Sequence, residues 1–178
     1  EQIVAGQCFL LGALNMPCEL HLYNVTMDLN VDAYGLVVVV MAPGSQGNVP
    51  PTSLTSCKWT NNTVLSNVAL VRGTQIVIQD VEATGNTFPG NVLSLSTSGT
   101  ENGTVIIQNV QVSNNKRSTD QGLSQGLAIY VDASPNTNSM LEISNCAFEG
   151  NTYTPMDGLS DKSGTILYFE SQMGSHSY

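Results

Sequence analysis

Basic side chains are the scarcest feature of this 178-residue chain. Lysine and arginine together number 5 against 14 acidic residues, so the formal net charge is −9. Nucleic acids and anionic membrane surfaces both select a basic footprint, which the sequence does not provide. Charged residues of either sign make up only 11% of the chain, well below the roughly 25% of an average globular domain. Asparagine, serine, threonine and glycine take their place, a composition more typical of extracellular repeat proteins than of cytosolic enzymes.

Long hydrophobic runs are also missing. The longest, residues 35–42, is short and rich in valine, whereas a membrane span needs about 18 apolar residues. No segment keeps the i, i+3, i+4, i+7 spacing of an amphipathic helix, so we expect almost no helix. The chain opens with neither an initiating methionine nor the basic stretch of a signal peptide. We therefore expect it to be a segment of a longer protein.

What the chain does contain is an eleven-residue pattern that occurs five times. The copies are LHLYNVTMDLN (20–30), TSLTSCKWTNN (52–62), IVIQDVEATGN (76–86), VIIQNVQVSNN (105–115) and LEISNCAFEGN (141–151). Positions 1, 3, 6 and 8 are apolar, apart from Thr52 at position 1 of the second copy, and position 11 is always asparagine. Position 5 is a small polar residue that can bond the backbone at a bend. Each copy is therefore predicted to hold two short strands, at positions 1–4 and 6–8.

A second apolar run follows each copy after a gap of variable length. These runs are GLVVVVMA (35–42), NVALVRG (67–73), GNVLSLS (90–96), GLAIYVDA (126–133) and GTILYFES (164–171). Their alternation predicts strands, and a unit of this size buries its apolar face only when neighbouring units stack. We predict an all-β fold, a right-handed parallel β-helix (solenoid) of about five coils with three short strands each. A jelly roll or β-sandwich is the competing fold, since its strands recur at similar intervals.

The asparagine column has a specific structural interpretation in this fold. Equivalent positions of stacked coils lie about 4.8 Å apart, close enough for each amide side chain to bond the next. We expect a buried ladder whose polar groups satisfy one another. Its members are Asn30, Asn62, Asn86, Asn115 and Asn151.

Residues 1–178 are interpreted as a single β-helix segment that is part of a longer solenoid. Residues 1–19 would end a preceding coil, because QCFLLGA (7–13) stands where a third strand belongs. Residues 20–171 would form the five coils, and residues 172–178 a tail. Neither end offers a capping helix or a charged edge strand. The expected partners are therefore further coils of the same chain, or other copies of it in end-to-end self-association.

The repeats also resemble a known group of surface proteins. FEGN (148–151), followed by GTILYF, is similar to the Phe-x-x-Asn and Gly-rich aliphatic repeats of polymorphic outer-membrane proteins, which are pectin-lyase-like β-helices. Similar Asn-rich repeats occur in large surface proteins of protozoan parasites. The resemblance covers residues 20–171. It implies an extracellular or cell-surface protein with an adhesive or structural role.

Four cysteines divide into two pairs. Cys57 and Cys146 share position 6 but lie three units apart, roughly 14 Å at about 4.8 Å per coil. This distance exceeds the reach of a disulfide, so both are interpreted as buried thiols that behave as small apolar residues. Cys8 and Cys18 lie outside the repeat, ten residues apart, and form a candidate disulfide in an extracellular setting.

Three sequons are candidate glycosylation sites, provided that the protein follows a eukaryotic secretory route. They begin at Asn24, Asn61 and Asn102. Asn24 stands at the position 5 bend and is expected to be buried, which would make it a poor acceptor. Asn61 and Asn102 fall at a strand exit and in a loop, and are better candidates.

The charged residues do not suggest catalysis. Polysaccharide lyases need a basic residue and hydrolases need paired carboxylates, yet no carboxylates stack on neighbouring copies. Lys58 aligns with Glu82 as a solvated pair across two coils. We therefore expect no catalytic, cofactor-binding or metal site. The predicted function is that of a non-enzymatic extracellular or cell-surface structural or adhesive protein, which presents loops or builds a fibre. The alternative is a polysaccharide-active lyase or glycoside hydrolase.

Recognition, if present, is expected in long loops. Residues 114–126 and 150–164 are predicted to extend from one corner, and the second loop carries Tyr153, Met156 and Asp157. Long loops on a rigid stack commonly hold binding residues, and host or matrix glycans and proteins are the expected partners. The alternative, to which we give equal weight, is that these loops are tolerated because they do no harm and have no binding role. Threonines at positions 9 and 12 would suggest an ice-binding face, but the array lapses in copies one and four.

Overall fold

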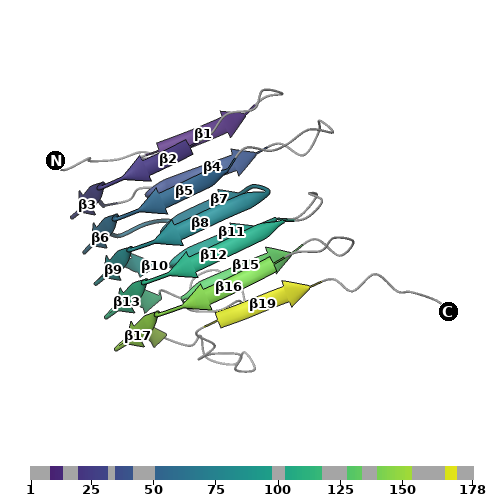
Figure 1. Ribbon diagram of the computed structural model, residues 1–178. Helices are drawn as coiled ribbons and strands as arrows, with labels where there is room; N and C mark the ends of the chain where they lie inside the picture. Colours follow the sequence, from purple (N-terminus) through teal and green to yellow (C-terminus); the bar gives the residue numbers. More distant parts are fainter. Residues whose placement is uncertain are drawn as a thin grey trace, which may run out of the picture.

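The computed structural model describes residues 9–13, 20–31, 35–41, 51–97, 103–117, 128–133, 140–153 and 167–171. Within these ranges the chain forms strands, isolated bridges and bends and no helix, so the predicted all-β class is confirmed. Accordingly, this part of the chain contains no helix with the length and apolar character needed to cross a membrane. Strands from successive repeats lie side by side in layers (Figure 1).

The first sheet collects the strands built on positions 1–4 of each copy. Its order is β16-β12-β8-β5-β2, so copies that follow one another in the sequence are neighbours in space. The strands are β2 (Leu20–Tyr23), β5 (Thr52–Thr55), β8 (Gln75–Gln79), β12 (Thr104–Gln108) and β16 (Met140–Ser144). Position 1 stays in register, because Thr52 pairs with Ile76 and Ile76 pairs with Val105.

The second sheet is built on positions 7–9, one residue later than the predicted 6–8. Its order is β17-β13-β9-β6-β3. The strands are β3 (Thr26–Asp28), β6 (Lys58–Thr60), β9 (Glu82–Thr84), β13 (Gln111–Ser113) and β17 (Ala147–Glu149). The shift arises because position 5 turns the chain, and position 6 still belongs to that turn.

The third sheet contains the apolar runs that follow each gap. Its order is β1-β4-β7-β11-β15-β19. The strands are β1 (Phe9–Ala13), β4 (Val37–Met41), β7 (Ala69–Arg72), β11 (Leu93–Ser96), β15 (Ile129–Ala133) and β19 (Leu167–Ser171). Strand β1 pairs with β4, so the strand within residues 7–13 lies beside the apolar run of the first copy.

A fourth sheet was not predicted. It has the order β10-β14-β18 and consists of two-residue strands directly after position 11. They are β10 (Thr87–Phe88), β14 (Lys116–Arg117) and β18 (Thr152–Tyr153), and a single bridge joins Thr63 to Thr87 in the same direction. Three strands per unit is thus an underestimate. A strand of two residues is too short to show a period of two in the sequence.

Every pairing among the described strands is parallel. A sandwich or jelly roll would pair its strands in antiparallel fashion, so the competing fold is wrong for this part of the chain. Parallel neighbours need a crossover of a dozen or more residues. The repeat provides it, since equivalent asparagines are separated by 24 to 36 residues.

Two bends in each copy place a residue in the left-handed region of backbone space. The first bend is at position 5, with φ between 52° and 55° at Asn24, Ser56, Asp80, Asn109 and Asn145. The second is at position 10, with φ between 53° and 67° at Leu29, Asn61, Gly85, Asn114 and Gly150. Only the bend at position 5 was predicted from the sequence. Asparagine and glycine adopt this conformation most readily, so their presence in four copies was an available signal for the second.

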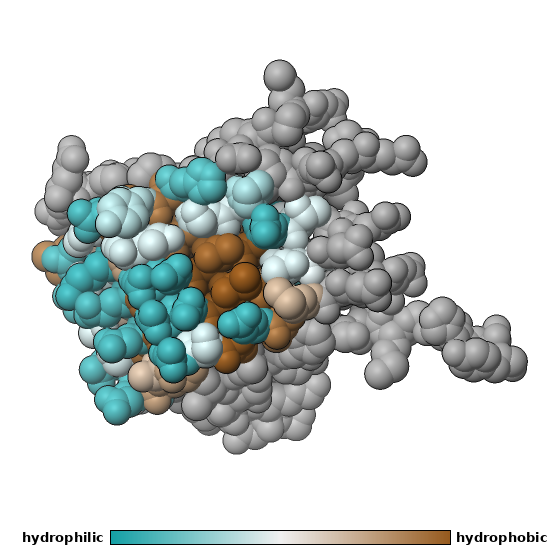
Figure 2. All heavy atoms as spheres, viewed as in Figure 1, coloured by the Kyte–Doolittle hydropathy of each residue, from teal (hydrophilic) through white to brown (hydrophobic). Residues whose placement is uncertain are grey.

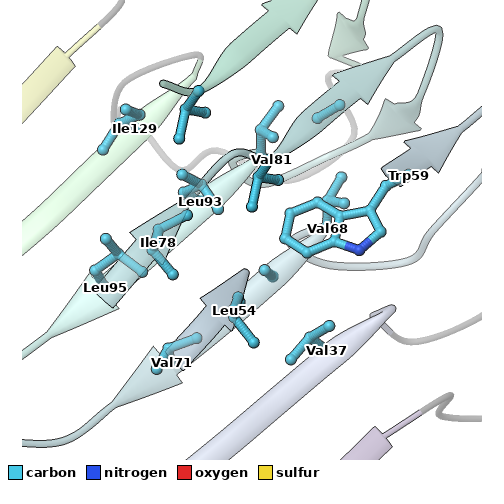
Figure 3. Close-up of a cluster of buried hydrophobic side chains, with 14 of the residues drawn as sticks. Val37, Leu54, Trp59, Val68, Val71, Ile78, Val81, Leu93, Leu95 and Ile129 are labelled. Atoms are coloured by element: carbon cyan, nitrogen blue, oxygen red, sulfur yellow. The ribbon is translucent and has the colours of Figure 1, made fainter. Parts of the chain in front are cut away.

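The sheets enclose one hydrophobic core. Inward residues at positions 1, 3, 6 and 8 meet alternate residues of the third sheet. Trp59 is the largest fully buried side chain, and Figure 3 draws it with Leu54, Val68 and other members of this core. Thr52, which interrupts the apolar pattern at position 1, is also fully buried. The alternation of each strand therefore fixes which side chains reach the surface.

Candidate functional site

The five asparagines of position 11 form one continuous ladder. In the first four copies, the side-chain Nδ2 donates to the Oδ1 of the asparagine in the next copy, at distances of 2.7 to 3.0 Å. The same Oδ1 accepts the backbone N–H of the preceding asparagine at 2.9 to 3.1 Å. The ladder runs through Asn30, Asn62, Asn86, Asn115 and Asn151.

The second hydrogen of these amides is also used. From Asn62 onward, Nδ2 donates to the backbone carbonyl at position 8 of the preceding copy, at 2.8 to 3.0 Å. Asn62, Asn86 and Asn115 thus use both side-chain donors and both lone pairs of the oxygen. All three are buried. A fully satisfied buried network holds neighbouring units in register and leaves no group to bind a ligand.

Polar side chains on the outer faces also pair with one another across strands. Lys58 Nζ lies 2.9 Å from Glu82 Oε2, with both side chains well exposed, as the alignment of the copies predicted. Such an exposed pair contributes less than about 1 kcal/mol. On the same sheet the Thr60 hydroxyl donates to Asp28 Oδ1 at 2.7 Å. Figure 2 shows hydrophilic residues gathered over the second sheet, beside a hydrophobic patch over the first.

Carboxylates do not converge on this surface. The position 9 column of the second sheet runs in register through Asp28, Thr60, Thr84, Ser113 and Glu149. Its two acids therefore lie at opposite edges of the sheet. Asp80, at a position 5 bend, accepts a hydrogen bond from Asn109 Nδ2 at 2.9 Å. Within the ranges that the structure describes, no three His, Cys, Asp or Glu side chains gather closely enough to hold a metal ion.

Two of the four cysteines lie in the described part of the chain, and both are free thiols. Cys57 is buried, and its Sγ donates to the Thr55 carbonyl at 3.4 Å. Burial raises the pKa of this thiol above its ordinary value of 9.0, and backbone hydrogen bonds with Val25 and Thr55 only partly oppose the shift. Cys57 is therefore held as a thiol rather than as a nucleophilic thiolate. Cys146, predicted to be buried, is only partly so because its copy lies at the edge of the sheets.

The sequon asparagines differ from expectation in one respect. Asn24 is exposed and not buried, because the left-handed bend at position 5 turns its side chain away from the core. Asn61 is exposed at the second bend, and its Nδ2 lies 3.4 Å from Asp28 Oδ1. Both side chains are thus on the surface. Asn102 lies outside the described residues.

Cys8 and Cys18, the candidate disulfide, lie outside the described residues, as do Met156 and Asp157 of the candidate recognition loop. The backbone of Tyr153 is described, and it ends strand β18 beside Arg117 of β14.

A cluster that sequence reasoning missed lies on the outer face of the third sheet. Strand β11 lies between β7 and β15, and its register places Ser94 between Leu70 and Tyr130. In the same way Ser96 lies between Arg72 and Asp132. We call these six residues the serine row. The flanking residues come from strands that are distant in the sequence, so only the pairing of the strands brings them together.

Comparison with known proteins does not assign the chain to a family. The chain matches no protein family, and it shows no significant similarity to curated proteins or to solved structures.

Proposed function

We propose that the four sheets wind as a right-handed parallel β-helix. The support is the repeated order of elements, in which each unit contributes one strand to each of the first three sheets and pairs in parallel with the next unit. Connections between parallel strands of one sheet are right-handed in about 98% of cases. The asparagine ladder supports the stacking of the units in register, because each amide bonds the equivalent amide one unit further along.

This β-helix serves as a non-enzymatic structural or adhesive element at the cell surface or outside the cell. The observation that carries the proposal is that polar side chains in the described part of the chain form hydrogen bonds and ion pairs with one another. Buried amides satisfy one another along the ladder, and the surface side chains of Lys58, Thr60 and Asn109 each pair with an acidic side chain of a neighbouring copy. A general acid or base has to reach a reacting atom from a shared site, whereas a scaffold needs a regular and rigid surface.

An assay of glycan cleavage tests this proposal against the polysaccharide-active alternative. The whole chain is incubated with acidic and neutral polysaccharides, with and without Ca²⁺, and the products are separated by size. We expect no cleavage above that of a sample unfolded by heat. Reproducible cleavage that disappears on Asp132→Asn or Asp80→Asn would overturn the proposal and identify the protein as an enzyme.

A further inference from the structure

The two serines of the serine row lie on the outer face of the third sheet, between bulkier side chains of β7 and β15. Leu93 and Leu95 of β11 belong to the core, and so do Val71 of β7 and Val131 of β15 (Figure 3 labels the first three). Because side chains alternate along a strand, Ser94 and Ser96 point away from the core. Serine is the shortest of the side chains in this cluster, so the residues beside it stand above the two hydroxyls.

Burial of the two serines is unusual for the outer face of a sheet. Ser94 is 8% exposed and Ser96 is 7% exposed. Ser96 has a partner, since its hydroxyl donates to Asp132 Oδ2 at 3.2 Å. Ser94, by contrast, has no partner for its hydroxyl within the described part of the chain. The Ser94 oxygen is not among the fully buried side-chain atoms that lack a partner, so it remains accessible to water, and a hydroxyl of a bound molecule would replace that water.

The two charged residues of the row, Arg72 and Asp132, have further hydrogen-bond donors and acceptors that a ligand could use. Arg72 is exposed, and its guanidinium has no ion pair among the described residues. Asp132 accepts one hydrogen bond from Ser96, which leaves other lone pairs of its carboxylate for a ligand. The strands of Arg72 and Asp132 are separated by β11, so the two residues lie about 10 Å apart, too far for an ion pair.

The chemistry of the row narrows the class of ligand. A polyanion would be repelled by Asp132 and by the net charge of −9. A cation would be repelled by Arg72. A neutral molecule that offers both donors and acceptors suits the five N–H groups of Arg72, the carboxylate of Asp132 and the Ser94 hydroxyl together. Leu70 and Tyr130, both partly exposed, add an apolar edge of the kind that borders small-molecule sites.

We propose that the serine row binds a neutral saccharide. The sugar lies along β11, with hydroxyls bonded to Arg72, Ser94 and Asp132 and its apolar face against Tyr130. This inference deepens the proposed adhesive function, because it names the chemistry that the surface would recognise. It includes no covalent step.

The test uses neutral trisaccharides as probes, namely cellotriose, maltotriose, mannotriose and chitotriose, with trigalacturonate as the anionic comparison. Each is titrated into isotopically labelled protein while backbone amide signals are recorded. We expect at least one neutral probe to shift the amides of residues 70–72, 94–96 and 130–132, and to bind more tightly than trigalacturonate. If no neutral probe binds at millimolar concentration, or if the shifts lie elsewhere, the proposal is wrong.

Variants then locate the contacts. Ser94→Ala should weaken binding about fivefold, and Asp132→Asn or Arg72→Met more than tenfold, in line with neutral and charge-assisted hydrogen bonds. Lys58→Met is the matched control, since it removes an exposed cation from the second sheet and should leave binding unchanged. Equal affinity in all four variants would overturn the proposal, once thermal melting shows that each is folded. Loss of binding and absence of cleavage are separate results, so either proposal can fail while the other stands.

Discussion

Leu29 holds a backbone conformation that suits its side chain poorly. Its φ of 54° lies in the left-handed region, where the other copies carry asparagine or glycine. A branched apolar residue in this region is strained by roughly 1–2 kcal/mol, and 54% of its surface is exposed, so burial gains little.

Leu29→Asn should therefore stabilise the protein by about 1 kcal/mol. The midpoint of urea unfolding measures the change. Leu65→Asn is the control, because Leu65 is 58% exposed and is absent from the residues with positive φ. That variant should change stability by less than about 0.5 kcal/mol. Equal effects at the two positions would show that backbone strain is not the cause.

Thr52 places a polar hydroxyl at position 1, where the other four copies carry an apolar residue. It is fully buried, and its Oγ1 has no hydrogen-bond partner among the described residues. Thr52→Val keeps the shape and removes the hydroxyl, so we expect a gain of about 1–2 kcal/mol in the free energy of unfolding. Thr60→Val makes the same chemical change where the hydroxyl donates to Asp28, and should be neutral or destabilising. A loss of stability in Thr52→Val would indicate that the hydroxyl is satisfied in solution.

At the scale of the elements, the register of the long strands could be predicted from the sequence. The two-residue strands and the serine row could not. Asparagine in one column and apolar residues at fixed offsets were enough to predict which strands pair, because one slipped residue would turn Ile76 and Ile78 outward. The two-residue strand at Thr87–Phe88 has too little pattern to detect. The serine row was invisible for another reason. In the sequence, Ser94 is an ordinary polar residue of an alternating strand. Its neighbours in the sheet, Leu70 and Tyr130, are more than 20 residues away along the chain.

The ladder lies between elements, and Asn86 is its central member. Its Nδ2 donates to the Trp59 carbonyl and to Asn115 Oδ1, both at 2.9 Å, and its Oδ1 accepts two hydrogen bonds from Asn62. Asn86→Ala would leave several buried groups unpaired, at about 1–3 kcal/mol each. We expect a loss of at least about 3 kcal/mol, measured by urea unfolding.

The matched control for Asn86 is an asparagine in the other column. Asn109→Gly keeps a residue that tolerates the positive φ and removes only an exposed hydrogen bond to Asp80, so it should change stability by less than about 1 kcal/mol. A small effect of Asn86→Ala would mean that the packed apolar core, and not the ladder, fixes the register.

At the scale of the whole molecule, the two edges of the first two sheets differ. Leu22 and Met27, in the first copy, are 8% and 4% exposed, whereas Leu141, Ile143 and Phe148 of the fifth copy are only partly buried. Strands β16 and β17 are also edge strands, and an unpaired edge with apolar side chains beside it favours addition of another strand.

We expect isolated chains to associate through the edge formed by β16 and β17. Sedimentation should show larger species as the concentration rises. Asn151→Ala should weaken the association, because it removes the amide that would extend the ladder, and Asn109→Gly should not. A monomer at all concentrations, with the amides of residues 141–149 protected from hydrogen exchange, would contradict this expectation.

The unequal spacing of the ladder has a mechanical consequence. Successive asparagines are bonded across 32, 24, 29 and 36 residues. If tension on the two ends detaches the units one at a time, each release adds the contour of one spacing, at about 3.4 Å per residue. The shortest unit would lengthen the chain by about 80 Å and the longest by about 120 Å. A pulling trace would then contain steps of different sizes, and the order of the steps would tell from which end the protein unravels.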